Sequence, residues 1–299
     1  MTVSIAGENS ISRRAGVSCG YVCSCIVAGM SARPNVLILR AAGTNCDHET
    51  AHAFELAGAT CTRVHINRLL ETPSLLHDFQ MLAIPGGFSY GDDIAAGKIL
   101  ATQIRQSLAD PLREFIEHKK PVIGICNGFQ VLAKTDLLPG QSDKQTLTLA
   151  HNAGGIFQDH WVSLKVVSQS RCVWTRAAHH ANPDSPIALP VAHGEGRFLI
   201  ASDAVRQSLY DNKQVAMVYV RGDGSPARGE FPHNPNGSQD DIAGVCDSTG
   251  LVFGLMPHPE RHISSLQHPT WTRSADAHEH EAPGLAIFRN GVSYCQQAL

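Results

Sequence analysis

The sequence predicts an α/β fold with a mostly parallel central sheet, helices on both faces of that sheet, and a second half that is richer in strand. Three observations lead to this fold class. Short continuous apolar runs alternate with helical patterns in the first half, as they do where strands are buried on both faces. The connections are short, which favours parallel strands joined by crossover helices. Apolar runs then dominate the second half.

The first half of the fold is predicted to begin at Asn35. The first helix is expected to start at Asp47, whose side chain can cap it, and to stop at Gly58. The predicted strands of this half are the apolar runs 36–39, 63–66, 81–84 and 122–125, and the further helices are 94–108 and 111–118.

The second half is expected to contain strands at 161–167, 215–220 and 251–256 and a closing helix at 283–289. The segment Arg171–Pro190 is polar and aperiodic, so it is predicted to be an insertion or loop. Residues 1–33 are expected to be a disordered or mis-assigned extension, with Met30 as the true start, and 34–299 to form a single domain. A targeting segment is the alternative, and only Arg13 and Arg14 before a mildly apolar run favour it.

Composition excludes several functional classes. A formal net charge of -3 without a basic stripe gives no footprint for nucleic acid, and no apolar stretch is long enough to suggest a membrane partner. The nine cysteines are odd in number and scattered, so we expect a reducing cytoplasmic location rather than a disulfide framework. Neither the group Cys19, Cys23 and Cys25 nor the histidines after Arg261 has a metal-ligand spacing, and no metal site is predicted.

The sharpest chemical feature is the run Gly124–Leu132. A buried strand ends directly at Cys126, Gly124 and Gly128 lie two residues to either side, and a helical pattern follows. This is the strand–turn–helix pattern of a nucleophile elbow, with cysteine in place of serine. A helix N-terminus favours the thiolate, which is the attacking species. An inert buried cysteine at a strand end remains the alternative.

Two further segments carry groups that such a cysteine needs. His258 and Glu260 follow a predicted strand, and a carboxylate beside a histidine can hold the ring in one tautomer for general acid–base work. Taken alone, a solvated loop pair would explain them. Gly86 and Gly87 end another predicted strand, and their backbone N–H groups suit an oxyanion, with Asn127 as the second donor. A phosphate-binding loop is weaker, because no Gly-Lys-Ser/Thr follows.

These motifs together resemble a known family. Cys126, the Gly-Gly turn and His258-x-Glu260, in this order, are similar to the triad (class I) glutamine amidotransferases. The segments 85–92, 124–132, 192–198, 234–238 and 256–261 more specifically resemble the family of glutaminase subunits of phosphoribosylformylglycinamidine synthase. The resemblance runs from about Asn35 to about Arg261 and implies a class I amidotransferase-like, flavodoxin-like fold.

The resemblance also implies the roles of single residues. Cys126 would attack the side-chain amide of glutamine, and His258, oriented by Glu260, would move the protons. The N–H groups of Gly87 and Asn127 would form the oxyanion hole. The residues implied to line the glutamine pocket are Phe88, Gln130 and the turn His193–Glu195, which includes Gly194, although a structural turn histidine is an equal explanation for His193. Segment 234–238 is expected to be a rigid turn or a surface that meets a partner.

The implied activity is glutamine hydrolysis for a separate synthetase subunit, possibly joined by a small accessory subunit. That partner would use ATP and Mg²⁺ to convert formylglycinamide ribonucleotide to formylglycinamidine ribonucleotide, while this chain would need no cofactor. A cysteine peptidase or γ-glutamyl hydrolase would share the elbow but leave segments 192–198 and 234–238 unexplained. A non-catalytic module on the same fold would be expected to lack one of the three triad residues, and all three are present.

Overall fold

The computed structural model of the chain describes residues 33–135, 137–140, 145–176, 185–273 and 281–298. Residues 32–299 form one compact unit. The expected N-terminal extension, with Cys19, Cys23 and Cys25, therefore lies outside the described residues apart from Arg33, and so do His278 and His280. In the described part of the chain, no helix is long and apolar enough to cross a membrane.

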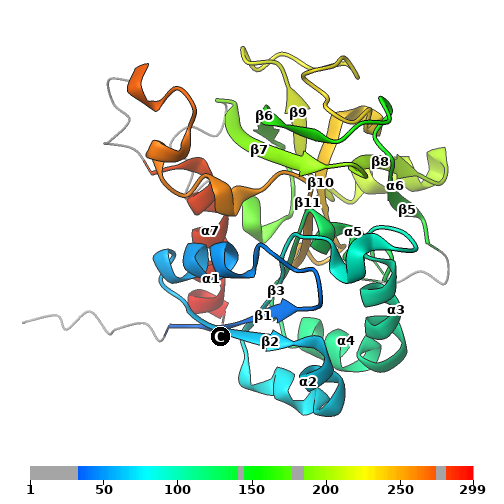
Figure 1. The fold of residues 1–299 in the computed structure, drawn as a ribbon, viewed down its shortest axis with the longest axis vertical. Coiled ribbons are helices and arrows are strands. Elements are labelled where there is room, and N and C mark those ends of the chain that lie inside the picture. The colour runs from blue at the N-terminus through cyan, green and yellow to red at the C-terminus, as the bar shows by residue number, and fades with distance from the viewer. Residues whose placement is uncertain (1–32, 136, 141–144, 177–184, 274–280, 299) are drawn as a thin grey trace, which may run out of the picture. The chain divides into compact units, whose positions relative to one another are not determined.

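A nine-stranded sheet organises the fold (Figure 1), in the order β2-β1-β3-β4-β11-β10-β9-β6-β7. Its first five strands run parallel to their neighbours. They are β2 (Thr60–His65), β1 (Asn35–Arg40), β3 (Met81–Ile84), β4 (Val122–Ile125) and β11 (Val252–Leu255). Both faces of β3 and β4 are buried, which explains their uninterrupted apolar sequences.

The other half of the sheet is antiparallel. It consists of β10 (Ile242–Cys246), β9 (Val215–Val220), β6 (Gln158–Val166) and β7 (Ile187–His193), and β5 (Leu147–Ala150) pairs with β8 (Arg197–Ile200) in a small separate sheet. The predicted α/β class and strand-rich second half are confirmed. The sheet as a whole is mixed rather than mostly parallel, because these later strands extend the parallel sheet instead of forming a layer of their own.

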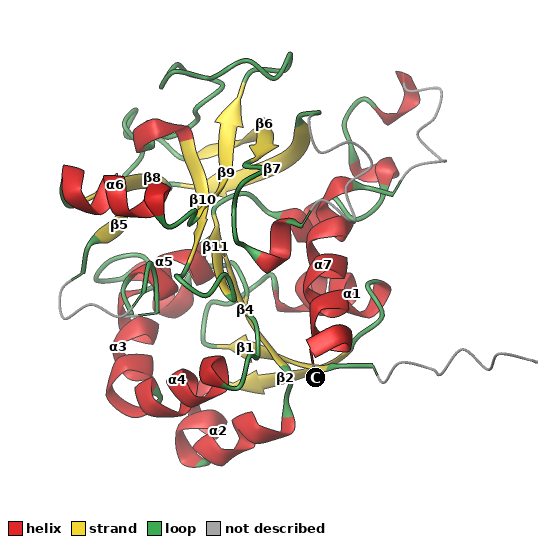
Figure 2. Ribbon diagram, turned by 180° about the vertical axis from the view of Figure 1, so that it is seen from behind, coloured by secondary structure: helices red, strands yellow, loops and turns green. Residues whose placement is uncertain are grey.

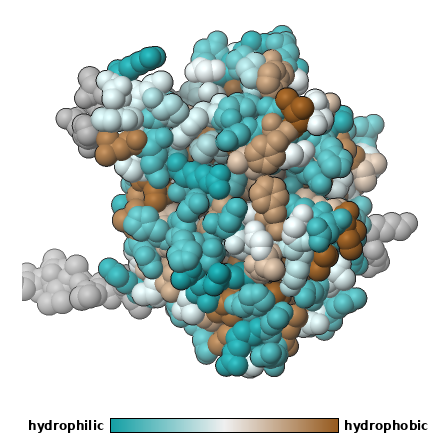
Figure 3. Space-filling model, viewed as in Figure 1, coloured by the Kyte–Doolittle hydropathy of each residue, from teal (hydrophilic) through white to brown (hydrophobic). Residues whose placement is uncertain are grey.

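Helices lie on two sides of the parallel strands, as Figures 1 and 2 show. α1 (Asp47–Leu56) and α7 (Pro283–Ala298) pack together on one side, and α3 (Lys98–Ser107), α4 (Ala109–Glu117) and α5 (Asn127–Ala133) lie on the other. α2 (Ile66–Glu71) and α6 (Asp203–Asp211) are peripheral. On the face drawn in Figure 3, hydrophilic residues predominate and hydrophobic ones form separate patches.

The predicted strands 81–84, 122–125 and 215–220 are confirmed to the residue. Several other boundaries were wrong. The strand predicted at 63–66 starts at Thr60 and ends at His65, and the helix predicted from Ile94 begins only at Lys98, after Gly97 with a φ of 69°. The closing helix continues to Ala298. Pairing with segments that are distant in sequence sets the ends of these helices and strands, and local sequence patterns do not report such pairing.

The start of α1 also differs from the prediction. The cap residue is Cys46 rather than Asp47, which is the first helical residue. The Asp47 carboxylate instead accepts ion pairs from Arg40, at 2.8 Å, and from Arg63, at 3.2 Å. Asp47 therefore ties the start of α1 to β1 and β2. The neighbouring cap residue, Cys46, faces a different part of the molecule.

The segment Arg171–Pro190 is not simply a loop. Within its described residues, a short 3₁₀ helix at Val173–Thr175 carries Trp174 into the core, and β7 begins at Ile187. The Trp174 indole N–H donates to the carbonyl oxygen of Leu251 at 2.9 Å, and the ring meets Phe54 edge-on. A single buried tryptophan among polar residues produces no periodic apolar pattern, so the sequence alone does not show that Trp174 belongs to the core.

The segment after Arg261 was expected to be a solvated polar loop, and for His262 this is wrong. The ring is buried, and its Nδ1 lies 2.6 Å from the carbonyl oxygen of Ala188. It also packs edge-on against Trp161, which contacts His268 in the same way. The start of this segment is thereby fixed against β6 and β7.

The close approach of α5 to the ends of the parallel strands depends on two glycines. A Cβ atom on Gly128 of α5 would lie 1.8 Å from the carbonyl oxygen of Ile84, at the end of β3. A Cβ on Gly124 would meet the Gly128 carbonyl oxygen at 2.6 Å. Because real contacts are never so short, the two glycines are required for helix α5 to rest directly on the strand ends.

We expect Gly128→Ala to lower the free energy of unfolding by about 3 kcal/mol, the upper end of over-packing costs, because the added methyl group must push α5 away from β3. Gly222→Ala is the matched control, since a Cβ there meets nothing within 4 Å. Urea unfolding of both variants measures the difference. Equal stabilities of the two variants would contradict the packing argument.

Candidate active site

Three loops meet at one edge of the sheet because β3, β4 and β11 are neighbouring parallel strands. The carboxyl ends of such strands face the same edge, where α/β folds form their sites. β3 runs into Gly86 and Gly87, β4 runs into Cys126, and β11 is followed by His258. The sheet order thus brings together the residues that the sequence analysis placed in one site.

Cys126 occupies a strained turn. Its backbone has φ 51° and ψ −104°, which side chains rarely adopt, and it links β4 directly to α5. Its N–H donates to the carbonyl oxygen of Leu255 at 2.8 Å, and its own carbonyl oxygen accepts from the Gln130 N–H at 3.1 Å. These bonds hold the turn from both sides. The structure therefore has the local geometry that the elbow motif predicted.

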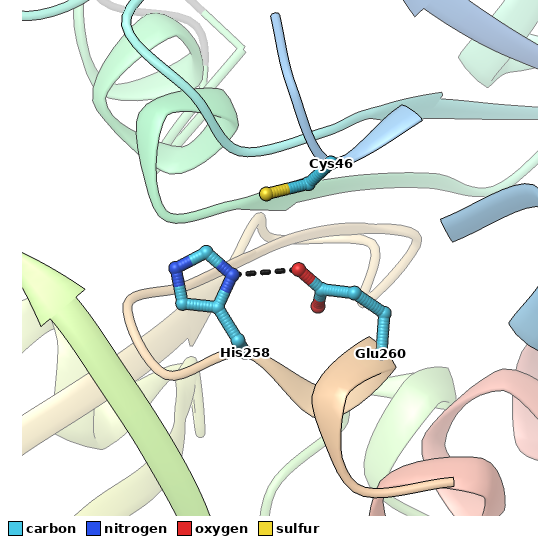
Figure 4. A group of neighbouring side chains, drawn as sticks. All are labelled: Cys46, His258 and Glu260. Atoms are coloured by element: carbon cyan, nitrogen blue, oxygen red, sulfur yellow. Dashed lines mark hydrogen bonds and ion pairs between the residues drawn. The ribbon is translucent and has the colours of Figure 1, made fainter. Parts of the chain in front are cut away.

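His258 and Glu260 form a buried pair. Nδ1 of the ring lies 2.6 Å from the carboxylate Oε1, and the two side chains are 2% and 0% exposed. The His258 N–H donates to the carbonyl oxygen of Pro190 at 2.8 Å, so β7 fixes the backbone here. Figure 4 shows the ring and the carboxylate facing each other. This hydrogen bond leaves Nε2 as the nitrogen available for proton transfer.

The His258 ring meets the nucleophile beside Gly86. A Cβ on Gly86 would lie 2.8 Å from the ring Cε1 atom and 3.5 Å from Cys126 Cβ. Burial alone would lower the pKa of His258, but the charges of Glu260 and Cys126 outweigh burial and raise this pKa well above its usual value. A charged imidazole beside a thiolate is the resting form that nucleophilic cysteines use.

The two expected oxyanion donors flank Cys126. Asn127 is the first residue of α5, where a helix leaves its N–H without an internal partner. Gly87 has a φ of 140°, and a side chain there would meet the Gly43 carbonyl oxygen at 2.6 Å. Among the described residues, its N–H donates to no acceptor, whereas the neighbouring Phe88 N–H is used by Gly43. Both N–H groups are thus free for a ligand.

A pocket of about 220 Å³ opens from Cys126. Its lining includes all the residues expected to bind substrate, namely Phe88, Gln130, His193 and Gly194, together with Gly87. It also includes Glu195, the last residue of the expected pocket turn, and Asp92 and His151, to which the sequence analysis assigned no contact. Phe88 is 47% exposed at this pocket, and its ring packs near that of Phe157. The pocket therefore has a partly aromatic rim and an acidic interior.

Asp92 and Glu195 supply the negative charge. The Asp92 carboxylate accepts from the Gly97 N–H at 3.0 Å and from the Asn127 side-chain amide at 3.1 Å. Burial, together with the nearby charge of Glu195, raises the pKa of Asp92. Two carboxylates that repel each other in a pocket are suited to a cationic ligand group.

Gln130 connects the two walls of the pocket. Its side-chain amide donates to the carbonyl oxygen of Glu195 at 2.6 Å, and its Oε1 accepts from the Asn127 side chain at 2.9 Å. The residue lines the pocket as expected, but its polar atoms already have protein partners. This arrangement favours a positioning role, in which Gln130 holds the Glu195 turn against α5.

His193 is held by asparagines. Nδ1 lies 3.2 Å from Asn152 Oδ1, and Nε2 lies 3.5 Å from the Asn236 side-chain amide. Burial, reinforced by the charge of His258, lowers the pKa of His193 to about 3, so the ring is neutral. With both nitrogens engaged, the ring supports the turn, and a direct contact with substrate stays a prediction.

The sequence analysis missed Cys46, which belongs to the same cluster. Its thiol, His258 and Glu260 are the one group of three ligand-type side chains close enough for a metal ion in the part of the chain that the structure describes. Nothing in the sequence around Cys46 marks it, because its neighbours come from a distant loop. Only the packing of α1 against the Pro259–Arg261 turn brings them together.

Comparison with known proteins agrees with this geometry. Residues 33–295 match the CobB/CobQ-like glutamine amidotransferase domain, and the chain is therefore a member of the glutamine amidotransferases. Solved structures with that overall fold include a glutamine amidotransferase from Thermotoga maritima, at 14% identity and a TM-score of 0.51 over 89% of this chain and 99% of that one.

Closer relatives define the family. The chain is 45% identical to the phosphoribosylformylglycinamidine synthase subunit PurQ of Dehalococcoides mccartyi, over 87% of this chain and 97% of the relative. It is 40% identical to the subunit of the same name from Methanococcus maripaludis, with the same coverage. The structure of PurLQS from Thermotoga maritima matches with a TM-score of 0.64 and 30% identity, over 88% and 99% of the chains. The chain belongs to the PurQ family.

We expect Glu260→Gln to lower the pKa of His258, because the carboxylate is the main group that opposes burial. Titration of the His258 ring by NMR, in the variant and the wild type, measures this directly. The wild-type ring should stay protonated above pH 6.5, and the variant ring should lose its proton at lower pH. Glu71→Gln is a control at an exposed carboxylate. A His258 pKa unchanged by Glu260→Gln would refute the pairing.

Proposed function

We propose that this chain is the glutaminase subunit of a phosphoribosylformylglycinamidine synthase. It hydrolyses L-glutamine to glutamate and ammonia, and the ammonia passes to a separate synthetase subunit. The observation that carries this proposal is that Cys126, the His258–Glu260 pair and two free backbone N–H groups meet beside an acidic pocket lined by Cys126 and Gly87. The names of the relatives supply the choice of reaction partner.

Acylation begins with the Cys126 thiolate, which attacks the side-chain amide carbon of glutamine. The amide oxygen gains negative charge and accepts hydrogen bonds from the N–H groups of Gly87 and Asn127, which stabilise the tetrahedral intermediate. Nε2 of His258 gives its proton to the departing nitrogen. The products of this step are ammonia and a γ-glutamyl thioester on Cys126.

Deacylation uses the same groups in reverse. His258, now neutral, takes a proton from a water molecule as the oxygen attacks the thioester carbonyl. Collapse of the second intermediate releases glutamate and restores the Cys126 thiolate and the charged ring. Glu260 keeps Nδ1 protonated throughout, so that Nε2 is always the nitrogen that exchanges the proton.

The acidic wall selects the amino-acid end of the substrate. Glutamine has an α-ammonium group, and Asp92 and Glu195 supply the opposite charge inside the pocket. The Glu195 carboxylate is only loosely engaged by the protein, since the Ala96 N–H lies 3.4 Å and His151 Nδ1 3.8 Å away. It is therefore the better placed of the two to bind an ammonium ion.

The remaining chemistry belongs to the partner. In this proposal, ATP and Mg²⁺ act on the synthetase subunit, which converts formylglycinamide ribonucleotide to its amidine, and a small accessory subunit completes the complex. A cytoplasmic location fits the six described cysteines, all of which are free thiols. Transfer within a complex matters because free ammonia would become protonated and lose its nucleophilic lone pair.

We expect purified wild-type chain with the synthetase subunit, ATP and formylglycinamide ribonucleotide to release glutamate from glutamine and form the amidine. Cys126→Ala should lower both rates by a factor of about 10³ or more, because it removes the covalent route. Amidine formation with added ammonium salt should survive in the same variant, since the synthetase does not need Cys126. Glutamate release that persists in Cys126→Ala would overturn the proposal.

Glu195→Gln should raise the KM for glutamine by about tenfold to a hundredfold, equivalent to one charged hydrogen bond, with kcat nearly unchanged. The reason is that the α-ammonium group lies away from the reacting amide and is bound equally in ground and transition states. Steady-state glutaminase kinetics, with Glu71→Gln as an exposed control, test this. A fall in kcat alone would assign Glu195 to catalysis instead.

A further inference from the structure

A second buried cysteine adjoins the catalytic pair. Figure 4 shows the Cys46 thiol beside the His258 ring. The Cys46 sulfur, a ring nitrogen of His258 and a carboxylate oxygen of Glu260 lie within 4.8 Å of one another, and all three residues are buried. Glutamine hydrolysis as described above makes no use of this thiol, so the cluster calls for a separate explanation.

The backbone holds Cys46 firmly in this place. It caps α1, and its N–H donates to the carbonyl oxygen of Gly86 at 3.3 Å, in the turn that also supplies the oxyanion hole. The thiol donates to Asn45 Oδ1 at 3.2 Å. A Cβ on Gly86 would lie 3.2 Å from the sulfur and 2.8 Å from His258 Cε1, so the thiol and the ring approach the same point.

Two atoms of the cluster have unused bonding capacity. Nε2 of His258 and Oε2 of Glu260 are buried and have no hydrogen-bond partner among the described residues. Orphaned polar atoms are costly in a protein interior, at about 1–3 kcal/mol each. Nε2 is the atom that exchanges protons in glutamine hydrolysis, so Oε2 beside the thiol is the independent indication that this cluster can accept a ligand.

The donor set fits a thiophilic cation. Thiolate, imidazole and carboxylate are the three ligand types that zinc prefers, at metal–ligand distances of about 2.0–2.3 Å. Ligand atoms around a tetrahedral ion stand about 3.5 Å apart at those distances. An ion therefore has to separate His258 Nδ1 from Glu260 Oε1, which are 2.6 Å apart, and hold the Cys46 sulfur at a similar spacing from both.

Arg261 and the charged His258 ring both oppose a cation here, and the ring has to lose its proton before it can bind an ion. The Arg261 Nη2 atom lies 3.1 Å from the Cys46 sulfur, and its Nε lies 3.2 Å from Glu49 Oε2. The guanidinium favours the thiolate, which is the form that binds metal. The side chains of Arg261 and Glu49 are 33% and 41% exposed, so an arriving ion can displace the guanidinium toward Glu49 and solvent.

We propose that Cys46, His258 and Glu260 form a binding site for a thiophilic divalent cation such as Zn²⁺, and that the bound ion inhibits the enzyme. The ion occupies the ring and the carboxylate that proton transfer requires, and it replaces the thiol proton of Cys46. Binding is independent of the proposed function, whereas inhibition rests on it.

Cobalt(II) added to metal-free protein tests the binding, because thiolate–cobalt bonds give a charge-transfer absorption band. The Cys126→Ala chain is used so that the nucleophile contributes no thiolate. This chain should bind one equivalent of Co²⁺ and show the band, and the further change Cys46→Ser should remove it. Cys61→Ser, at a half-buried thiol elsewhere, should leave it intact. Glu260→Gln, which retains the thiol, should weaken binding at least tenfold.

Each result decides the matter. A band that persists after Cys46→Ser, or the absence of any band in the Cys126→Ala chain, would overturn the site. For inhibition, Zn²⁺ should suppress glutamate release by otherwise wild-type chain, and a chelator should restore it. Cys46→Ser should be at least tenfold less sensitive relative to its own zinc-free rate. Cobalt binding without glutaminase activity would refute only the proposed function, and the converse would refute only the metal site.

Discussion

The parallel adjacency of β3, β4 and β11 is the constraint on which the site depends. The Cys126 N–H bonds to the carbonyl oxygen of Leu255, so the elbow is tied to the strand that leads to His258. Because β11 also pairs with antiparallel β10, it is the strand at which the two halves of the sheet join. The nucleophile and its base therefore meet along the line where the sheet changes direction.

Burial of the His258–Glu260 pair is costly for stability and useful for chemistry. A carboxylate with 0% exposure loses its hydration, and only an opposite charge with good geometry offsets that loss. The charged ring provides it, so the ring is held in the protonated state that a thiolate nucleophile needs. The same burial leaves Glu260 Oε2 without a hydrogen-bond partner among the described residues.

The sequence analysis succeeded where the signal lies within one short segment of the chain. The elbow at Cys126 was recognisable because Gly124 and Gly128 must be glycine for α5 to rest on the strand ends, and strands buried on both faces are continuous apolar runs. It failed where contacts come from distant segments. Trp174, His262 and Cys46 have unremarkable neighbours in sequence, and each is buried by an element that lies far away in the chain. The long antiparallel extension was likewise invisible, since strand direction depends on pairing.

The antiparallel half of the sheet explains segments 192–198 and 234–238, which the triad of Cys126, His258 and Glu260 alone does not explain. Asn234 and Asn236 are 2% and 1% exposed, and Asn234 Oδ1 accepts from the Gly237 and Ser238 N–H groups, so this segment is a rigid buried turn. Asn236 in turn supports the ring of His193, the last residue of β7. That support fixes the turn whose Glu195 carbonyl binds Gln130 on α5. The substrate pocket is therefore assembled where the two halves of the sheet join, with Cys126 and Asp92 from the parallel half and Glu195 from the antiparallel half.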